Sequence, residues 1–227
     1  MKTLPNLFEN NRRWSERMIA GRPKFFQELA GQQAPEFLWI GCSDSRVPAN
    51  EIVDLAPGEL FVHRNVANVV VHTDLNCLSV LQYAVDVLGV RHVIVTGHYG
   101  CGGVRTVLDG VKLGLIDNWL RHVADVYHKH RPIVDDAGSA APDRLCELNV
   151  IEQSLHICET TIVQDAWARG HSLAVHGWLY SLRDGMLRDT SFMADSAAAV
   201  APAYANAVEL VRQAGSQVER RATSLEA

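Results

Sequence analysis

Two apolar runs in this chain each stop at a glycine and are followed at once by side chains that bind metals. The first run, residues 37–41, is followed by Cys-Ser-Asp-Ser-Arg, and the second, residues 93–97, by His-Tyr-Gly-Cys-Gly-Gly. Short apolar runs of this length are typical of strands that are buried on both faces. Because open α/β sheets place their sites at the carboxyl ends of the strands, the two sets of side chains are expected to form one metal site.

Zinc fits the side chains that these runs release. Cys42, His98 and Cys101 would supply two sulfurs and one nitrogen, and three protein ligands with an open position is the catalytic zinc pattern. Asp44 is a fourth candidate, but Arg46 offers a planar fork that could hold this carboxylate away from the metal. The site is therefore expected to be open or closed, depending on whether Asp44 binds Arg46 or zinc.

Two other uses of these residues have less support. A redox pair would need the spacing C-x-x-C, which does not occur in the sequence. A dinucleotide loop would need G-x-G-x-x-G, whereas residues 97–103 read G-H-Y-G-C-G-G. A lone H-x-x-C is a weak indication of metal, so the zinc interpretation depends on both motifs together.

The paired motifs, C-x-D-x-R at 42–46 and G-H-x-x-C-G-G at 97–103, resemble those of the β-class carbonic anhydrases. The similarity runs from about residue 6 to about residue 189 and is nearest to the bacterial, bicarbonate-regulated type. It implies one zinc per subunit and the reversible hydration of carbon dioxide to bicarbonate and a proton. On this resemblance Asp44, held by Arg46, orients a zinc-bound hydroxide, and homodimers assemble into a homotetramer.

The resemblance also implies roles for residues around the metal. A narrow, mostly apolar substrate cleft, supplied partly by a neighbouring subunit, would be formed by Gln33, Phe61, Val66, Tyr83, Gly102 and Gly103. A non-catalytic bicarbonate would be bound by Trp39, Arg64 and Tyr180. On the alternative interpretation, Arg64 is a buried guanidinium that donates to backbone carbonyls beside two core aromatic residues.

Composition indicates one globular domain and excludes several classes of protein. The 227 residues suffice for one α/β core, and a net charge of −5 gives no basic field for nucleic acid. No window approaches the ~18 apolar residues that a membrane span needs, and the N-terminus lacks the apolar segment of a signal peptide. Five unevenly spaced cysteines do not suggest a disulfide framework, so a reducing cytoplasm is expected.

Strands that alternate with helical segments predict a parallel sheet. The expected strands are 36–41, 59–64, 92–97, 172–176 and 186–189. The resemblance adds that four of them form a parallel core and that the fifth is an edge strand. The expected division is an N-terminal helical arm (1–34), a helix-flanked α/β zinc core (35–190) and a C-terminal helical tail (191–227).

Several expectations concern the helices and loops around this sheet. Residues 6–30 should form two helices broken at 21–23, and the resemblance implies that they reach a second subunit. Residues 129–142 are expected to be a loop, and residues 142–168 one long helix that begins at a proline and ends near Gly170. A last helix is expected over 199–213, with frayed residues beyond Gly215. Cys77, Cys146 and Cys158 lack flanking ligands, so structural roles are expected for them.

Two functions rival carbon dioxide hydration. One is the same chemistry on carbonyl sulfide or carbon disulfide, which only a comparison of substrates would separate. The other is a non-catalytic zinc or thiol-sensing protein, which predicts a closed site. The intact pair of Asp44 and Arg46 argues against this second alternative.

Overall fold

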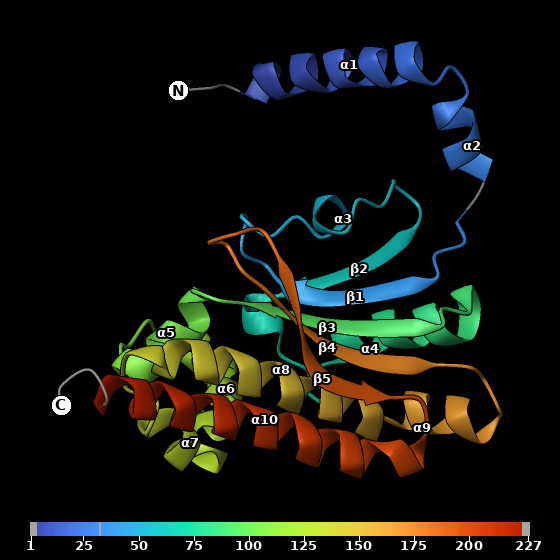
Figure 1. The fold of residues 1–227 in the computed structure, drawn as a ribbon. Helices are drawn as coiled ribbons and strands as arrows, with labels where there is room; N and C mark the ends of the chain where they lie inside the picture. Colours follow the sequence, from blue (N-terminus) through green and yellow to red (C-terminus); the bar gives the residue numbers. More distant parts are fainter. Residues whose placement is uncertain (1–3, 32, 224–227) are drawn as a thin grey trace.

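Five strands form a single sheet in the computed structural model, which describes residues 4–31 and 33–223. The sheet order is β2-β1-β3-β4-β5, with bounds β1 (Phe37–Cys42), β2 (Leu60–Asn65), β3 (His92–His98), β4 (Ala174–Tyr180) and β5 (Leu187–Ala194) (Figure 1). The first four strands run parallel, and β5 is antiparallel to β4. This confirms the predicted four-stranded parallel core with an added edge strand.

The burial of the strands explains their order. Every residue of β1 and β3 except the first is buried, as expected for central strands covered on both faces. Along β4 the burial alternates, and β5 is mostly exposed at the sheet edge. Since β1 and β3 are adjacent, their carboxyl ends lie side by side, and both motifs begin there.

Helices cover the sheet unequally. Their bounds are α1 (Leu4–Gly21), α2 (Phe25–Gly31), α3 (Ala49–Ile52), α4 (Leu75–Gln82), α5 (Gly102–Asp109), α6 (Ile116–Lys129), α7 (Arg131–Asp135), α8 (Ala141–Glu159), α9 (Thr161–Ala168) and α10 (Ala197–Thr223). In Figure 1, α4, α8 and α10 lie on one side of the sheet, and α3 lies on the other. Of these, α8 contacts β3, β4 and β5, which makes it the central helix of the core.

The N-terminal arm stands away from this core (Figure 1). Helix α1 contains no buried residue, and its apolar side chains Leu4, Leu7 and Phe8 are exposed. Trp14 makes an edge contact with Phe26 of α2, at 5.6 Å between ring centroids. The two helices were expected, and the break between them lies at residues 22–24.

The structure corrects four of the expected boundaries. The expected loop 129–142 contains α7, which has a proline in its first turn, and a 3₁₀ turn at Gly138–Ala140. The expected helix over 142–168 breaks at Thr160, where extended backbone ends α8 and the Thr160 hydroxyl caps α9. Strand β5 continues past residue 190. The last helix continues beyond Gly215 to Thr223.

A membrane-spanning helix does not occur among the residues that the structure describes, because none of their helices is both long and apolar enough.

Candidate metal centre

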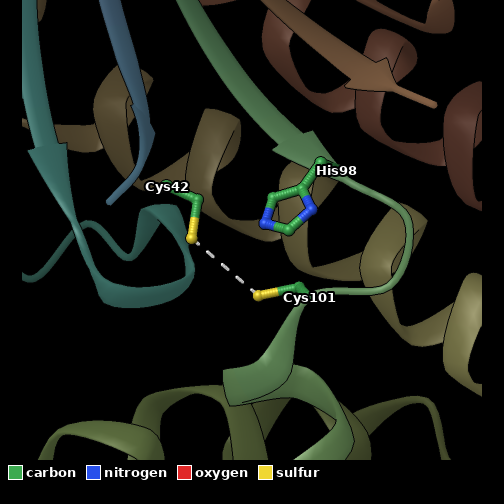
Figure 2. Close-up of side chains that lie close together, drawn as sticks. All are labelled: Cys42, His98 and Cys101. Carbon is green, nitrogen blue, oxygen red and sulfur yellow. Dashed lines mark hydrogen bonds between the residues drawn. The ribbon is translucent and has the colours of Figure 1, made fainter. Parts of the chain in front are cut away.

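The predicted ligands meet at the carboxyl edge of the sheet. Cys42 is the last residue of β1, His98 is the last residue of β3, and Cys101 immediately precedes α5. Their ligand atoms all lie within 4.8 Å of one another, and the two sulfurs are 4.0 Å apart. Figure 2 shows the two thiols and the imidazole pointing toward one another. All three residues are buried.

The imidazole of His98 is prepared to bind a metal through one nitrogen. Its Nδ1 lies 3.1 Å from the carbonyl oxygen of Tyr99, and because a carbonyl only accepts, Nδ1 carries the proton. The lone pair is therefore on Nε2, which is buried and has no hydrogen-bond partner among the residues that the structure describes. A metal-ligating histidine commonly donates its other N–H to a carbonyl in this way. Two sulfurs and one free imidazole nitrogen fit zinc.

The two thiols are electrostatically coupled. A hydrogen bond from Cys101 lowers the pKa of Cys42, and although burial opposes this shift, hydrogen bonds from His98 and from the backbone of Asp44 and Ala67 add to it. The same bond raises the pKa of Cys101. At this distance the two sulfurs share one proton. A soft dication bound between them would favour loss of that proton and stabilise both sulfurs as thiolates.

Asp44 is held by Arg46. The Arg46 Nε and Nη2 atoms donate to the two carboxylate oxygens at 2.9 and 2.6 Å, and the Arg46 backbone N–H donates at 3.0 Å. These bonds keep the pKa of the Asp44 carboxyl well below its usual range. The Asp44 Oδ2 atom is nevertheless only 3.7 Å from His98 Nε2. The carboxylate thus binds its guanidinium partner while it borders the ligand cluster.

Glycines close the loop that carries Cys101. Gly100 has φ +71°, which suits a residue without Cβ. At Gly103 a Cβ would lie 3.1 Å from Leu120 and 3.2 Å from Ala67, so a larger residue would force the neighbouring segments apart. Val66 also packs there, with its Cγ1 at 3.4 Å from the same position. Val66 and Gly103, both predicted for the cleft, therefore adjoin the metal centre, and the neighbouring Gly102 is exposed.

Other predicted cleft residues lie elsewhere on the chain. Phe61 and Tyr83 contact each other, with ring centroids 5.9 Å apart, and Tyr83 is 45% exposed. Phe61 precedes by four residues Asn65, the register partner of Cys42, which places it ~13 Å back along its strand. Gln33 is exposed between α2 and β1.

The residues of the predicted bicarbonate trio lie on three strands, Trp39 on β1, Arg64 on β2 and Tyr180 on β4. Arg64 is exposed rather than buried, and it donates to the carbonyl oxygens of Cys42 at 2.8 Å and of Asp44 at 2.6 Å. Trp39 is buried, and a Cβ at Gly41 would lie 2.4 Å from its indole nitrogen. Tyr180 ends β4 opposite His98. Arg64 thus has the carbonyl partners of the alternative interpretation, and bicarbonate binding stays a prediction.

A second group of ligand-type side chains comprises His63, Asp74 and Cys77. The His63 Nε2 atom faces the Nδ2 donor of Asn65 at 3.3 Å, which occupies its lone pair. Asp74 caps α4 by accepting from the Asn76 N–H. Burial raises the pKa of the Cys77 thiol to about 12. These contacts favour the structural role expected for Cys77.

Sequence reasoning missed the buried amides beneath the metal centre. Asn149 donates to the carbonyl of Ala67 at 2.9 Å, and Gln153 accepts from the Val70 N–H at 2.7 Å. Both lie on α8, one turn apart, and face the segment that follows β2. The available signal was a pair of amides spaced by four residues within a helix otherwise rich in apolar side chains.

Comparison with known proteins agrees with the geometry. Residues 37–187 match the family model for carbonic anhydrase. A carbonic anhydrase of Emericella nidulans is 48% identical over 191 residues, which cover 83% of each chain. A carbonic anhydrase of Pseudomonas aeruginosa is 35% identical over 173 residues, covering 73% of this chain and 78% of the relative.

Solved structures share the fold. The Coccomyxa beta-carbonic anhydrase in complex with acetazolamide has a TM-score of 0.82 and 39% identity, covering 86% of this chain and 90% of that one. A tetrameric beta-carbonic anhydrase of Sordaria macrospora has a TM-score of 0.79 and 35% identity, covering 84% and 98%. Because relatives from fungi, an alga and a bacterium all match, the expected bacterial subtype stays a prediction.

Proposed function

The chain belongs to the carbonic anhydrases, in the β class, and it is an enzyme of that kind; we propose that it hydrates carbon dioxide reversibly at a zinc bound by Cys42, His98 and Cys101. The observation that carries this proposal is the buried, unpartnered Nε2 of His98 beside two sulfurs. When bound, zinc would act as a Lewis acid that makes water a nucleophile near neutral pH.

The residues around the cluster would orient the reactants. Asp44 is ionised and its orientation is fixed by two bonds from Arg46, so it can accept a hydrogen bond from the attacking water and aim the water's lone pair. Gly102 and Gly103 leave room for a small substrate close to backbone. Val66 adds an apolar wall, which suits linear, nonpolar carbon dioxide.

A second subunit would complete the cleft. Phe61 and Tyr83 form an aromatic pair remote from the ligands of their own chain, and Tyr83 is largely exposed. Helix α1 presents apolar side chains that its own core leaves uncovered. We therefore include in the proposal a homodimer in which these arms exchange and the aromatic pair and Gln33 line the partner's site. The tetrameric Sordaria macrospora relative supports further assembly to a homotetramer.

Asp44 would also act as a regulatory switch. In a closed form Asp44 would itself hold the zinc, whereas in the open form Arg46 would hold Asp44 and leave that position to water, whose ionisation would release one proton. High pH then favours the open form and low pH the closed one, and a ligand specific to the closed form inhibits. Bicarbonate bound by Trp39, Arg64 and Tyr180 is proposed as that ligand. Arg64→Ala should relieve bicarbonate inhibition at pH 7.5 and keep zinc; identical inhibition curves would remove Arg64 from this role.

Location and substrate choice complete the proposal. Five free cysteines, two of them proposed zinc ligands, suit a cytoplasmic protein, and cell fractionation tests this. Carbonyl sulfide and carbon disulfide remain rival substrates, although no observation on the structure favours them.

The decisive assay measures zinc content together with stopped-flow hydration. Zinc-loaded protein should hydrate carbon dioxide far faster than the sulfur analogues, and Cys101→Ala should lose metal and turnover together. Cys158→Ala is the matched control, because this thiol is equally buried but lies near the C-terminal end of α8, outside the group of Cys42, His98 and Cys101. Zinc-loaded protein without hydration activity would refute the proposed function, and full zinc in Cys101→Ala would refute the ligand assignment.

A further inference from the structure

A strained turn follows β2. Ala67 has φ 63° and ψ 27°, and Asn68 has φ 47°, so two consecutive residues that are not glycine adopt left-handed backbone. Such a conformation brings the Cβ of an L-residue close to its own carbonyl and is rarely adopted without support. Backbone strain of this kind persists where the surrounding structure determines it, and it is concentrated at functional sites. The support for this turn can be identified.

The turn touches all three segments that carry the proposed metal ligands. Asn65, which immediately precedes it, is the register partner of Cys42. A Cβ at Gly97, next to His98, would lie 3.2 Å from Asn68 Oδ1. A Cβ at Gly103, two residues after Cys101, would lie 3.2 Å from Ala67 Cβ. The turn therefore fills the space between the ends of β1, β3 and the start of α5.

Side chains from α6 and α8 donate hydrogen bonds to the backbone of this turn. Asn149 Nδ2 donates to the Ala67 carbonyl at 2.9 Å, and Trp119 Nε1 donates to the Val66 carbonyl at 2.8 Å. Gln153 fixes the orientation of Asn149, because Gln153 Oε1 accepts from Val70 N–H and its Nε2 donates to Asn149 Oδ1 at 3.1 Å. Asn149 must then present its NH₂ group to the turn.

The position of Asn149 makes this contact specific. The residue is 1% exposed on α8, 82 residues away in sequence from the carbonyl that it binds. A buried amide is tolerated only when it is hydrogen-bonded, and an apolar residue of similar size would suit the core equally well. Packing alone therefore does not explain an asparagine at this position, whereas its hydrogen bond to the Ala67 carbonyl does.

We propose that Asn149 is a positioning residue, which holds Ala67 and Asn68 in the left-handed conformation and thereby keeps the segments that carry Cys42, His98 and Cys101 in place. It touches no reacting atom and acts through the backbone of Ala67. The catalytic part of this inference rests on the proposed function, whereas the conformational part does not. Residues that orient metal ligands in this indirect way are commonly worth 10–100-fold in affinity or activity.

The test first removes the Asn149 donor and then relieves the backbone strain at Ala67 that the donor is proposed to support. Asn149→Leu approximately keeps the size of the side chain and does not weaken the helix, and we expect about a tenfold loss of kcat and faster zinc loss to a chelator. Adding Ala67→Gly should restore both to within about threefold, since glycine adopts positive φ without support. Ser154→Ala is the control, because this buried hydroxyl donates to the Val150 carbonyl within the same helix. A loss caused by general core damage would not be rescued at position 67.

Trp119 supplies a readout that does not depend on activity. In protein labelled with 5-fluorotryptophan, five fluorine signals are expected, and Trp119→Phe assigns one of them. We expect that signal to move in Asn149→Leu and to return in the double variant. Should Asn149→Leu not fold, Ala67→Val applies the same test, because a β-branched residue disfavours the left-handed conformation.

Two results would overturn the inference. One is wild-type kcat, zinc retention and Trp119 signal in Asn149→Leu, or in Ala67→Val where the first variant does not fold. The other is a loss in Asn149→Leu that Ala67→Gly does not restore. If the wild-type protein failed to hydrate carbon dioxide, the proposed function would fail, while the Trp119 signal and zinc loss would still decide the role of Asn149.

Discussion

Two of the ion-paired carboxylates differ in how they are held, one at the metal centre and one between helices. Asp44 is 16% exposed, and its cationic partner is Arg46, two residues further along the same loop. Glu152 of α8 is 4% exposed and is bound by Lys129 Nζ at 2.9 Å, His130 Nε2 at 2.6 Å and Tyr204 Oη at 2.5 Å. Asp44 and Arg46 are close in sequence, whereas Glu152 and its three partners join three helices.

This difference separates the carboxylate that we propose to act in catalysis from one that stabilises the fold. The partners of Glu152 come from α6, its C-terminal flank and α10, so breaking the group detaches elements of the fold. Asp44 binds its partner within one loop and keeps an oxygen 3.7 Å from His98, so it can change partner while the fold stays intact. Substitutions at the two sites should therefore change different measured quantities.

The largest effect is expected at Asp44. Asp44→Asn keeps the shape of the side chain but loses the charge that orients the nucleophile, and hydration should fall by about 100-fold. Zinc content and melting temperature should stay close to wild type. Stopped-flow assays and metal analysis of the same sample check this. Undiminished turnover in Asp44→Asn would remove the distinction between the two carboxylates.

The reverse pattern is expected at Glu152. Glu152→Gln removes the charge of a buried carboxylate that accepts hydrogen bonds from Lys129, His130 and Tyr204, which should lower the free energy of unfolding by about 3 kcal/mol. Turnover per folded molecule should be unchanged. Denaturant titration measures the loss, and Asp135→Asn is the control, since it breaks an exposed ion pair on α7 and should have no resolvable effect. Normal stability with lost activity would reverse our assignment.

The stabilisation that Glu152 provides should be lost in acid. Burial opposes the charge on Glu152, yet hydrogen bonds from His130, Tyr204 and Lys129 outweigh it and lower the pKa of Glu152 to about 2. Its contribution to stability is therefore complete above an unfolded pKa near 4.5 and is lost as the pH falls toward 2. We expect Glu152→Gln to destabilise the protein by about 2 kcal/mol less at pH 3 than at pH 6. A difference independent of pH would contradict this.

The smallest effect is expected from Tyr204→Phe. This variant removes one of the three hydrogen bonds to Glu152. It keeps the aromatic ring, whose centroid lies 4.9 Å from Lys129 Nζ. The free energy of unfolding should fall by about 1 kcal/mol. A loss as large as that of Glu152→Gln would show that the hydrogen bond from Tyr204, rather than the ion pairs, provides most of the stabilisation at Glu152.

The sequence predicted features that neighbouring residues determine and missed features that depend on contacts between distant segments. Cys42, Asp44 and Arg46 lie within five residues, and an apolar run before them indicates the strand that places them. The sheet follows from such runs. The turn at Ala67 depends on Asn149, 82 residues away, and no local pattern predicts left-handed backbone at an alanine. The break at Thr160 was missed because apolar residues continue on both sides of it.

The central claim is the identity of the ligands, and zinc K-edge X-ray absorption of the purified protein tests it most directly. The account predicts two sulfurs at about 2.3 Å, one imidazole nitrogen at about 2.0 Å and one further oxygen or nitrogen atom. Water or Asp44 would supply this last atom. A zinc bound by three or four sulfurs, or by none, would contradict the assignment of Cys42, His98 and Cys101.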